Sequence, residues 1–323
     1  MEIVNDYEGS SIEIIEIKEN KCILSLEKEN GKYSYYFNFK IITKDSNVEI
    51  IIKNIDNSQY SNSKRTVFIK DCDKWKKYNS FKVDQEGLHI NVDKNKNIEI
   101  SSSPRYVLED LEKFENSISE YVMKNTEIPE IRMGNKEKQA IVIIARQHPG
   151  ETLSSFFLEG MIKGILNNKE LLKNYMFIIF PFVNVLGVKE GNHRYYNKID
   201  YNRSWKKNEP KEIQYIKKTI CKYNIKDFID IHNDEVTNFS YVRTNKSINE
   251  MPDIKVLKDI SKAKRFIRAI IKERKIIDLS RYTAREFAIK KYKCRGTLIE
   301  LSMLKEDCES SYNKGKMFIE KQF

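Results

Sequence analysis

The chain has 323 residues, with 58 Lys and Arg against 47 Asp and Glu and a formal net charge of +11. Most of this charge is Lys spread among acidic residues, which argues against a nucleic-acid-binding protein, because such binding normally needs a focused basic stripe. A hydrophobic content of 40%, with 18 Tyr and 16 Phe, can fill a sizeable core and argues against disorder. This length predicts two domains.

The five cysteines are an odd number, are widely spaced and form no CxxC pair, which favours reduced thiols over a disulfide framework. The first twenty residues lack the basic and apolar regions of a secretory signal. No stretch approaches the eighteen consecutive apolar residues that a membrane span requires. We therefore expect a soluble cytoplasmic protein without a membrane partner; its oligomeric state stays open, a homo-oligomer included.

Residues 1–103 are predicted to form an antiparallel β-sandwich domain. Short segments rich in Ile, Val, Tyr and Phe alternate with Asn, Asp, Gly and Lys, a pattern typical of such sandwiches. The predicted strands are 11–17, 21–27, 32–43, 47–53, 65–69, 87–92 and 97–101. The SSSP segment at 101–104 interrupts the pattern, so we place the domain boundary between residues 103 and 104.

Residues 104–323 are predicted to form an α/β domain. Four apolar runs, which do not alternate with polar residues, indicate buried strands at 140–145, 175–182, 227–232 and 296–301. Helical spacing of apolar residues between them predicts helices at 107–122, after residue 152, at 211–223 and at about 254–274. Such interleaving is typical of a mixed, largely parallel sheet with helices on both faces.

The segment ARQHPGET at 145–152 is the strongest candidate for a functional site. It follows the buried strand 140–145, and open α/β sheets bind their ligands at the carboxyl ends of their strands. His148 and Glu151 are separated by Pro and Gly, so the imidazole and the carboxylate can turn toward one point. Catalytic zinc sites use such nitrogen and oxygen ligands, usually three, and leave one position for water.

His232 is the candidate third ligand because it ends the buried strand at 227–232, again at the carboxyl edge of the sheet. The chain has only four histidines, and two of them fall at the ends of predicted buried strands. In the alternative interpretation, His148 lies in an ordinary loop and His232 is hydrogen-bonded within the core. This alternative is favoured for either histidine taken alone, but it is disfavoured when both histidines and Glu151 are considered together.

A polar stretch at 191–205 contains Arg194, Asn202 and Arg203 after a buried strand. The planar guanidinium of Arg matches a carboxylate, so this stretch can bind a carboxylate and an oxyanion. A solvated basic loop is the alternative interpretation.

Glu300 lies within the apolar strand GTLIELS at 296–302. A carboxylate inside a buried strand is unfavourable by several kcal/mol unless it is paired or functional. Alternatively, it faces solvent at the strand end or pairs with a buried arginine.

Together these segments resemble the carboxypeptidase A-like zinc metallopeptidases, and more closely their cytosolic carboxypeptidase branch, in which a β-sandwich precedes the catalytic domain. The segment ARQHPGETLSSFFLEGMIKGIL resembles the HPGE ligand motif and its helix. GNHRYYNKIDYNRSW resembles the G-N-x-R and D-x-N-R-x-W stretches, and DFIDIHNDE resembles the strand ending in D-x-H. The similarity covers about residues 104–305.

The resemblance implies one zinc ion (Zn2+) per chain, bound by His148, Glu151 and His232. Asp200 would orient His148, as carboxylates near zinc sites commonly do. Glu300 would act as the general base, taking a proton from the attacking water and delivering it to the leaving amine.

The resemblance also implies that the C-terminus of a peptide or protein is the substrate. Arg194 would polarise the scissile carbonyl, while Asn202 and Arg203 would bind the terminal carboxylate. The family's pocket-floor position corresponds to Arg285, which would favour acidic C-terminal residues; the alternative interpretation is a surface arginine. Tyr282 is the nearest candidate for the family's mobile capping tyrosine.

One turn departs from the family pattern, since the usual N-P-D-G reads NVLG at 184–187. Two other functions therefore stay open. A related zinc hydrolase that cleaves an N-acyl amino acid or a peptidoglycan stem peptide would need neither Asn202 nor Arg203. A catalytically silent zinc- or peptide-binding module would not need Glu300.

Overall fold

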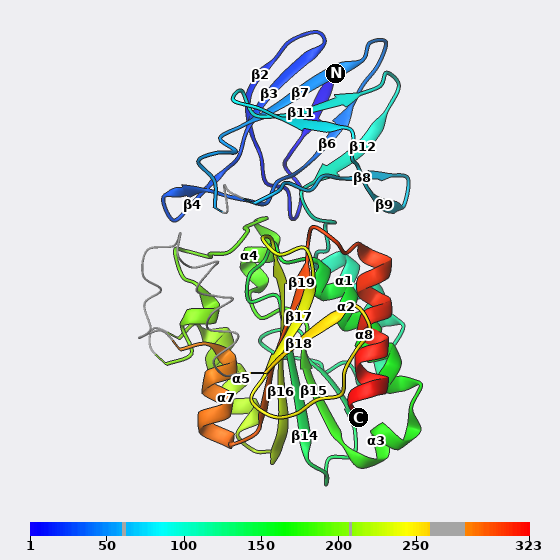
Figure 1. Cartoon of the computed structure of the whole chain (residues 1–323), viewed down its shortest axis with the longest axis vertical. Helices are drawn as coiled ribbons and strands as arrows, with labels where there is room; N and C mark the ends of the chain where they lie inside the picture. Colours follow the sequence, from blue (N-terminus) through cyan, green and yellow to red (C-terminus); the bar gives the residue numbers. More distant parts are fainter. Residues whose placement is uncertain (60–62, 207–208, 259–281) are drawn as a thin grey trace.

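The computed structural model describes residues 1–59, 63–206, 209–258 and 282–323. Antiparallel sheets form one end of the molecule and a helix-covered sheet forms the other (Figure 1). This arrangement confirms the predicted α/β fold preceded by a β-sandwich. The boundary predicted between residues 103 and 104 falls between the last strand of the sandwich, which ends at Ser101, and a helix that begins at Leu108; it stays a prediction.

The sandwich consists of two five-stranded sheets around one apolar core, with strand orders β1-β6-β12-β8-β9 and β10-β11-β7-β3-β2. All neighbouring strands of these sheets run antiparallel except β3 and β7, which are parallel. A separate hairpin, β4–β5, extends from the sandwich. The strands are β1 Glu2–Val4, β2 Glu13–Ile17, β3 Lys21–Ser25, β4 Lys28–Glu29, β5 Lys32–Tyr33, β6 Asn38–Ile42, β7 Val48–Lys53, β8 Phe68–Asp71, β9 Lys74–Lys77, β10 Phe81–Val83, β11 Leu88–Val92 and β12 Asn97–Ser101.

The second part contains a seven-stranded sheet with the order β13-β15-β14-β16-β19-β17-β18. The four central strands β15, β14, β16 and β19 are parallel, and β13 and β17 pair with them antiparallel. The strands are β13 Ile131–Gly134, β14 Ala140–Ala145, β15 Met176–Phe180, β16 Ile225–Asp234, β17 Ser240–Thr244, β18 Ile254–Lys258 and β19 Arg295–Ser302. The four predicted apolar runs are these four central strands.

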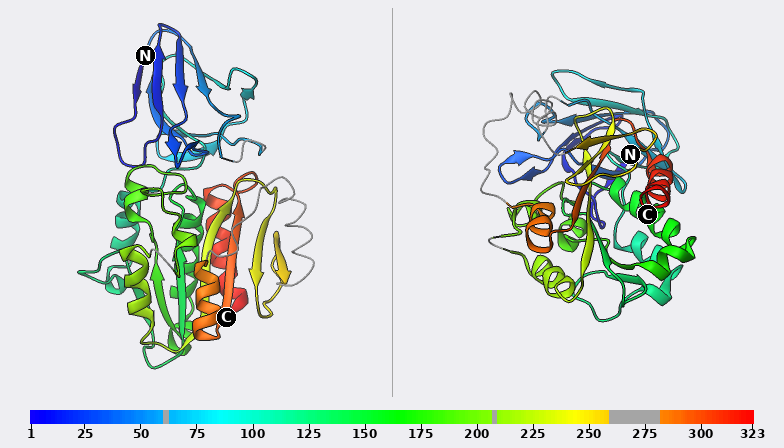
Figure 2. Two further views of the ribbon diagram at one scale, coloured as in Figure 1. Left: turned by 90° about the vertical axis from the view of Figure 1, so that its left-hand side faces the viewer. Right: turned by 60° about the horizontal axis from the view of Figure 1, so that its bottom comes forward.

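Helices cover both faces of this sheet (Figure 2). Alternate residues of β14 enter two separate apolar cores, one shared with α2 and α8 and the other with α5 and α7. A strand buried on both sides has no polar face, which explains the unbroken run AIVIIA. The helices are α1 Leu108–Asn116, α2 Leu153–Leu166, α3 Lys169–Asn174, α4 Val185–Lys189, α5 Lys211–Ile220, α7 Ala284–Tyr292 and α8 Cys308–Gln322.

One sequence-based prediction is wrong in its first five residues. The helix expected at 254–274 begins instead as the strand β18, which pairs with β17 through residues fourteen positions earlier. Helical spacing within the segment could not reveal this pairing partner. The rest of that predicted helix lies outside the described residues.

The carboxyl ends of β14, β16 and β19 share one edge of the sheet, and the sandwich lies beyond this edge (Figure 1). Hydrogen bonds connect the two parts there: the Gly9 amide donates to the Lys189 carbonyl at 3.0 Å, and Lys77 Nζ donates to the Leu304 carbonyl at 3.1 Å. Among the helices of the described ranges, none has the length and apolar composition needed to cross a bilayer. All five cysteines are described, and each is free.

Candidate active site

Three predicted metal ligands converge at the carboxyl edge of the sheet. One ligand atom from each of His148, Glu151 and His232 lies within 4.8 Å of the others, and all three residues are buried. His148 Nδ1 lies 2.5 Å from Glu151 Oε1, and His232 Nδ1 lies 2.7 Å from Glu151 Oε2. The strands β14 and β16 are parallel neighbours, so the residues that follow them meet at one point.

The ligand-bearing loop after β14 is shaped by a buried guanidinium. Arg146, with a φ of 57° and only 2% exposed, donates to the carbonyls of Pro149 and Tyr106, the latter at 2.9 Å. Gly150 has no room for a side chain, because an added Cβ would lie 2.8 Å from the His193 ring. These contacts fix the direction in which the loop presents His148 and Glu151.

Two carboxylates contact the far nitrogens of the histidine rings. Asp200 Oδ1 lies 3.2 Å from His148 Nε2, and Asp230 Oδ1 lies 3.0 Å from His232 Nε2. An ionised carboxylate only accepts hydrogen bonds, so each Nε2 donates to its carboxylate. Each Nδ1 faces Glu151 and the common centre.

Asp230 is itself fixed by a chain of hydrogen bonds that the sequence analysis did not identify. Gln147 Nε2 donates to Asp230 Oδ1 at 2.8 Å, and Trp205 Nε1 donates to Gln147 Oε1 at 2.7 Å. The available sequence signal was the D-x-H spacing, which puts Asp230 and His232 on one side of β16.

The charges of these groups shift one another's pKa values. Burial alone lowers the pKa of His232, but Asp230 and Glu151 together raise it well above its ordinary value. Burial alone raises the pKa of Asp200, but the charges of Arg194 and His148 hold it below its ordinary range. Burial alone also raises the pKa of Glu151, but the charges of His148 and His232 and their hydrogen bonds lower it below its ordinary value.

Two imidazole nitrogens and one carboxylate, buried and facing one point, are the donor set that zinc takes in catalytic sites. The carboxylates on both Nε2 atoms are the outer contacts that such ligands usually have. The residues present therefore fit a zinc ion.

Glu300 lies on β19, directly beside His232 in the strand register, with Tyr241 of β17 on its other side. Burial raises the pKa of Glu300 well above its ordinary value, against the opposing charge of His232. Two neighbouring carboxylates have other partners: Asp234 Oδ1 accepts the Thr237 amide at 2.9 Å, and Glu235 Oε1 lies 2.9 Å from His193 Nε2.

The structure brings the predicted substrate-binding stretch to the same centre. Arg194 donates to Asp200 Oδ2 through Nε at 3.0 Å and through Nη2 at 2.8 Å. Asn202 Nδ2 lies 3.1 Å from His232 Nε2, and Arg203 Nη1 donates to the Asn202 carbonyl at 2.9 Å.

Arg285 lies farther from the ligands, on α7. It is 8% exposed, and its Nε donates to the Gly296 carbonyl at 2.9 Å. Gly296 and Glu300 are on the same side of β19, four residues or about 13 Å apart along the strand. Arg285 is therefore a buried residue on the Glu300 face of the sheet, not a surface arginine.

Tyr282 contacts the segment beside the site through its main chain, where the Trp205 amide donates to the Tyr282 carbonyl at 3.3 Å, and the centroid of its ring lies 5.3 Å from Lys206 Nζ. Residues 259–281, which precede it directly, lie outside the described part of the chain. The assignment of a capping tyrosine stays a prediction.

The turn that departs from the family pattern keeps its two structural residues. Asn184 Oδ1 accepts the Gly187 amide at 3.0 Å and caps α4. A Cβ at Gly187 would lie 2.6 Å from Pro149 Cγ, so the turn packs directly on the ligand loop. Val185 and Leu186 stand where the family pattern has Pro and Asp, and neither residue takes part in these two contacts.

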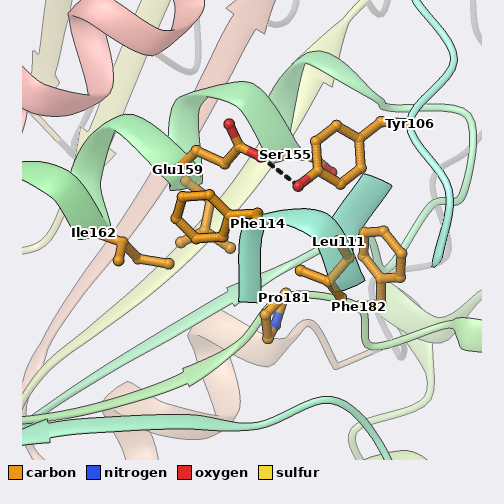
Figure 3. Close-up of a pocket in the computed structure, with 9 residues that line it drawn as sticks. Tyr106, Leu111, Phe114, Ser155, Glu159, Ile162, Pro181 and Phe182 are labelled. Carbon is orange, nitrogen blue, oxygen red and sulfur yellow. Dashed lines mark hydrogen bonds between the residues drawn. The ribbon is translucent and has the colours of Figure 1, made fainter. Parts of the chain in front are cut away.

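A separate cavity of about 10 Å³ lies between α1 and α2, lined by apolar residues with Tyr106 donating to Glu159 at 2.5 Å (Figure 3). A cavity of this size has room for at most one water molecule, and none of the metal ligands lines it. It adds nothing to the site.

A family model described as zinc carboxypeptidase matches residues 96–315, which is most of the chain. The chain belongs to the zinc carboxypeptidase family. The family is named for zinc, and His148, Glu151 and His232 of this chain form a donor set that could hold that ion.

Two mouse proteins illustrate the similarity to curated relatives. Cytosolic carboxypeptidase 6 is 35% identical over 118 residues, which are 32% of this chain and 22% of that protein. Cytosolic carboxypeptidase 1 is 37% identical over 75 residues, which are 22% of this chain and 6% of that protein. The chain thus matches only a small part of these relatives' length.

Solved structures share the fold over almost the whole chain. A metallo-carboxypeptidase from Burkholderia cenocepacia has a TM-score of 0.82 at 17% identity, covering 98% of this chain and 96% of its own. A metallo-carboxypeptidase from Pseudomonas aeruginosa, in complex with (2-guanidinoethylmercapto)succinic acid, has a TM-score of 0.79 at 19% identity, covering 99% and 98%. Both parts of the fold, sandwich and α/β, are therefore shared.

Proposed function

We propose that this chain is a zinc-dependent carboxypeptidase that hydrolyses C-terminal residues of peptides or proteins. The observation that supports it most is the meeting of His148, Glu151 and His232 at the carboxyl edge of the sheet, with Glu300 beside His232 in the register. The names of the curated relatives and the five free cysteines support a cytoplasmic location.

Zinc bound by these three ligands supplies Lewis-acid activation of water and of the scissile carbonyl. Glu300 accepts the proton of the attacking water and returns it to the leaving amine. A carboxyl group whose pKa is raised by burial suits both steps, since it holds a proton more readily than an ordinary carboxylate does.

Substrate binding falls to the stretch that contacts Asp200 and His232. Arg194, oriented by Asp200, polarises the carbonyl, and Asn202 with Arg203 binds the terminal carboxylate. This second task distinguishes a carboxypeptidase from a zinc hydrolase that acts on an N-acyl amino acid or a peptidoglycan stem peptide.

The deciding experiment combines zinc analysis with a panel of peptides read by mass spectrometry. The wild-type protein should contain about one zinc per chain, and His232→Ala should lose most of it. Glu300→Gln should retain zinc and fold but lower turnover by about 10²- to 10⁴-fold, because an amide cannot accept the proton. Glu309→Gln, exposed on α8, is the matched control and should be fully active.

Three outcomes would contradict this proposal. Full zinc content in a folded His232→Ala variant would refute the ligand set. Near-normal turnover in Glu300→Gln would refute the general base. A zinc-loaded wild type that trims no peptide would favour the silent binding module.

A preference for acidic C-terminal residues is the finer part of the proposal. Arg285 is buried on the Glu300 face of the sheet, and the net charge of +11 attracts acidic chains. A buried guanidinium favours a charged partner strongly over an apolar one.

Peptides ending in Glu or Asp should therefore be trimmed faster than those ending in Lys or Leu, and added salt should reduce the difference. Arg285→Ala should abolish the preference without loss of zinc, whereas Lys291→Ala, exposed on the same helix, should retain it. A wild type that prefers basic or apolar ends would refute the acidic preference and leave the peptidase proposal intact.

A further inference from the structure

The β4–β5 hairpin of the sandwich carries a carboxylate into the loop that bears Arg194. Glu29, only 8% exposed, accepts hydrogen bonds from three consecutive main-chain amides. The His193 amide donates to its Oε1, while the amides of Arg194 and Tyr195 donate to its Oε2 at 2.9 Å and 3.2 Å. Successive amides that point at one anion form a concave binding site in which a buried charge is well satisfied.

The loop held by Glu29 contacts the site at two places. The Arg194 guanidinium donates twice to Asp200, whose other oxygen contacts His148. The His193 carbonyl accepts the Gly150 amide at 2.8 Å, within the segment that carries the metal ligands. A displacement of the main chain at 193–195 would therefore displace the side chain expected to polarise the substrate.

Two further residues contact the same loop, one in the turn after β7 of the sandwich and one directly after β16. His193 Nδ1 lies 3.2 Å from Gln59 Oε1 of the sandwich, and His193 Nε2 lies 2.9 Å from Glu235 Oε1. The ring of Tyr35, also from the sandwich, lies 5.8 Å from the His193 ring. The histidine ring thus fills the junction between the sandwich and the catalytic sheet.

We propose that Glu29 is a positioning residue for the hydrolysis proposed above, on which this inference rests: it holds residues 193–195 so that Arg194 reaches the substrate carbonyl. The sandwich is then a part of the active site's construction and not an attached module. Glu29 is not one of the three candidate metal ligands, and it acts through Arg194 by accepting the amides of residues 193–195.

The kinetic test uses Glu29→Gln in the full chain, because the amide has the shape of the carboxylate but lacks its charge and one acceptor oxygen. The kcat of the zinc-loaded variant should fall by up to about 10²-fold, as small misplacements of a reacting group do. KM should change less than about threefold, since Asn202 and Arg203 bind the substrate's carboxylate independently of this loop. Lys32→Ala, exposed on the same hairpin, is the control and should change neither constant.

A double variant separates positioning from general destabilisation. If Glu29 acts through Arg194, adding Glu29→Gln to Arg194→Ala should lower kcat less than about twofold further, because the two changes are then not additive. An equal kcat loss with and without Arg194, or a single Glu29→Gln variant with kcat within twofold of wild type, overturns the proposal.

Hydrogen exchange of the main-chain amides provides a readout that does not depend on activity. The amides of Arg194 and Tyr195 should exchange at least about tenfold faster in Glu29→Gln than in wild type, since their protection comes from the Glu29 carboxylate. Unchanged exchange overturns the proposal. A wild type that trims no peptide overturns the proposed function instead, and the exchange data then decide by themselves whether Glu29 holds the loop.

Discussion

Four carboxylates at the candidate site differ in what they contact, although all are close to His148 or His232. Asp200 and Asp230 each face an Nε2 atom, and Glu151 faces both Nδ1 atoms. Glu300 lies beside His232 with no such contact to a ring nitrogen, and burial raises its pKa. Residues of one chemical type thus have different tasks because each has a different partner.

Asp230→Asn should lower zinc affinity by about 10- to 100-fold, the usual effect of losing an outer partner of a metal-binding histidine. The amide can still accept one hydrogen bond from His232, so the fold should persist while the charge is lost. Competition with a chromogenic chelator measures the affinity, with the exposed Asp45→Asn as control. Unchanged affinity would show that Asp230 serves packing alone.

A pH-dependent contribution to stability is expected from Glu115 at the end of α1. Burial raises the pKa of this carboxyl to about 7, with a further contribution from Glu112. Within the described residues its Oε1 has no hydrogen-bond partner. Between about pH 4.5 and 7 the folded state then binds more protons than the unfolded state, so stability falls as pH rises.

The Glu115→Gln variant should not show the loss of stability that ionisation of Glu115 causes as the pH rises. Its melting temperature should exceed that of wild type at pH 8, and the advantage should disappear at pH 4.5, where the wild-type carboxyl is protonated in the folded state. Thermal unfolding at the two pH values measures the difference. An equal gain at both values would point to helix propensity instead of ionisation.

At the scale of elements, α2 and α8 are in backbone contact through glycines. A Cβ at Gly160 would lie 1.9 Å from the Tyr312 carbonyl oxygen, and a Cβ at Gly315 would lie 1.9 Å from the Phe157 carbonyl oxygen. Because α2 begins directly after the ligand-bearing loop, this contact also supports the loop.

Gly315→Ala should destabilise the protein, although Ala is the better helix former by about 1 kcal/mol. The added methyl group meets backbone atoms that cannot rotate away, and such overpacking typically destabilises by about 1 to 3 kcal/mol. Asn313→Ala, exposed on the same helix, should instead be neutral or slightly stabilising. Chemical denaturation measures both, and a stabilised Gly315→Ala variant would disprove the close contact.

At the scale of the whole molecule, the site is assembled from segments distant in sequence. Glu151 follows β14 and His232 ends β16, and the loop beside them is held by Glu29 of the sandwich. A metal bound between these segments therefore links elements that separate when the chain unfolds.

Removal of zinc should lower the melting temperature. A ligand present at a thousand times its Kd stabilises the native state by about 4 kcal/mol, and for a domain of this size that corresponds to a shift on the order of 10 °C. Calorimetry before and after chelation measures the shift, with recovery on adding zinc as control. A chelator-treated His232→Ala variant should show almost no shift.

The sequence by itself determined the four central strands of the α/β sheet and the three residues that could hold a metal ion. The runs at 140–145 and 227–232 are apolar on both faces, and each is followed by chemistry-bearing residues at the carboxyl edge. Burial of an unbroken apolar run and the ligand preferences of zinc are local properties, so they can be read from neighbouring residues.

Tertiary structure alone decided which further residues serve the site. Asp230 is oriented by Gln147, which Trp205 holds from 58 positions away, and Glu29 reaches Arg194 across 165 positions. β18 became a strand because β17 was available to pair with it. These outcomes depend on pairing and hydrogen bonding between distant segments, and no local spacing encodes which distant partner a residue will meet.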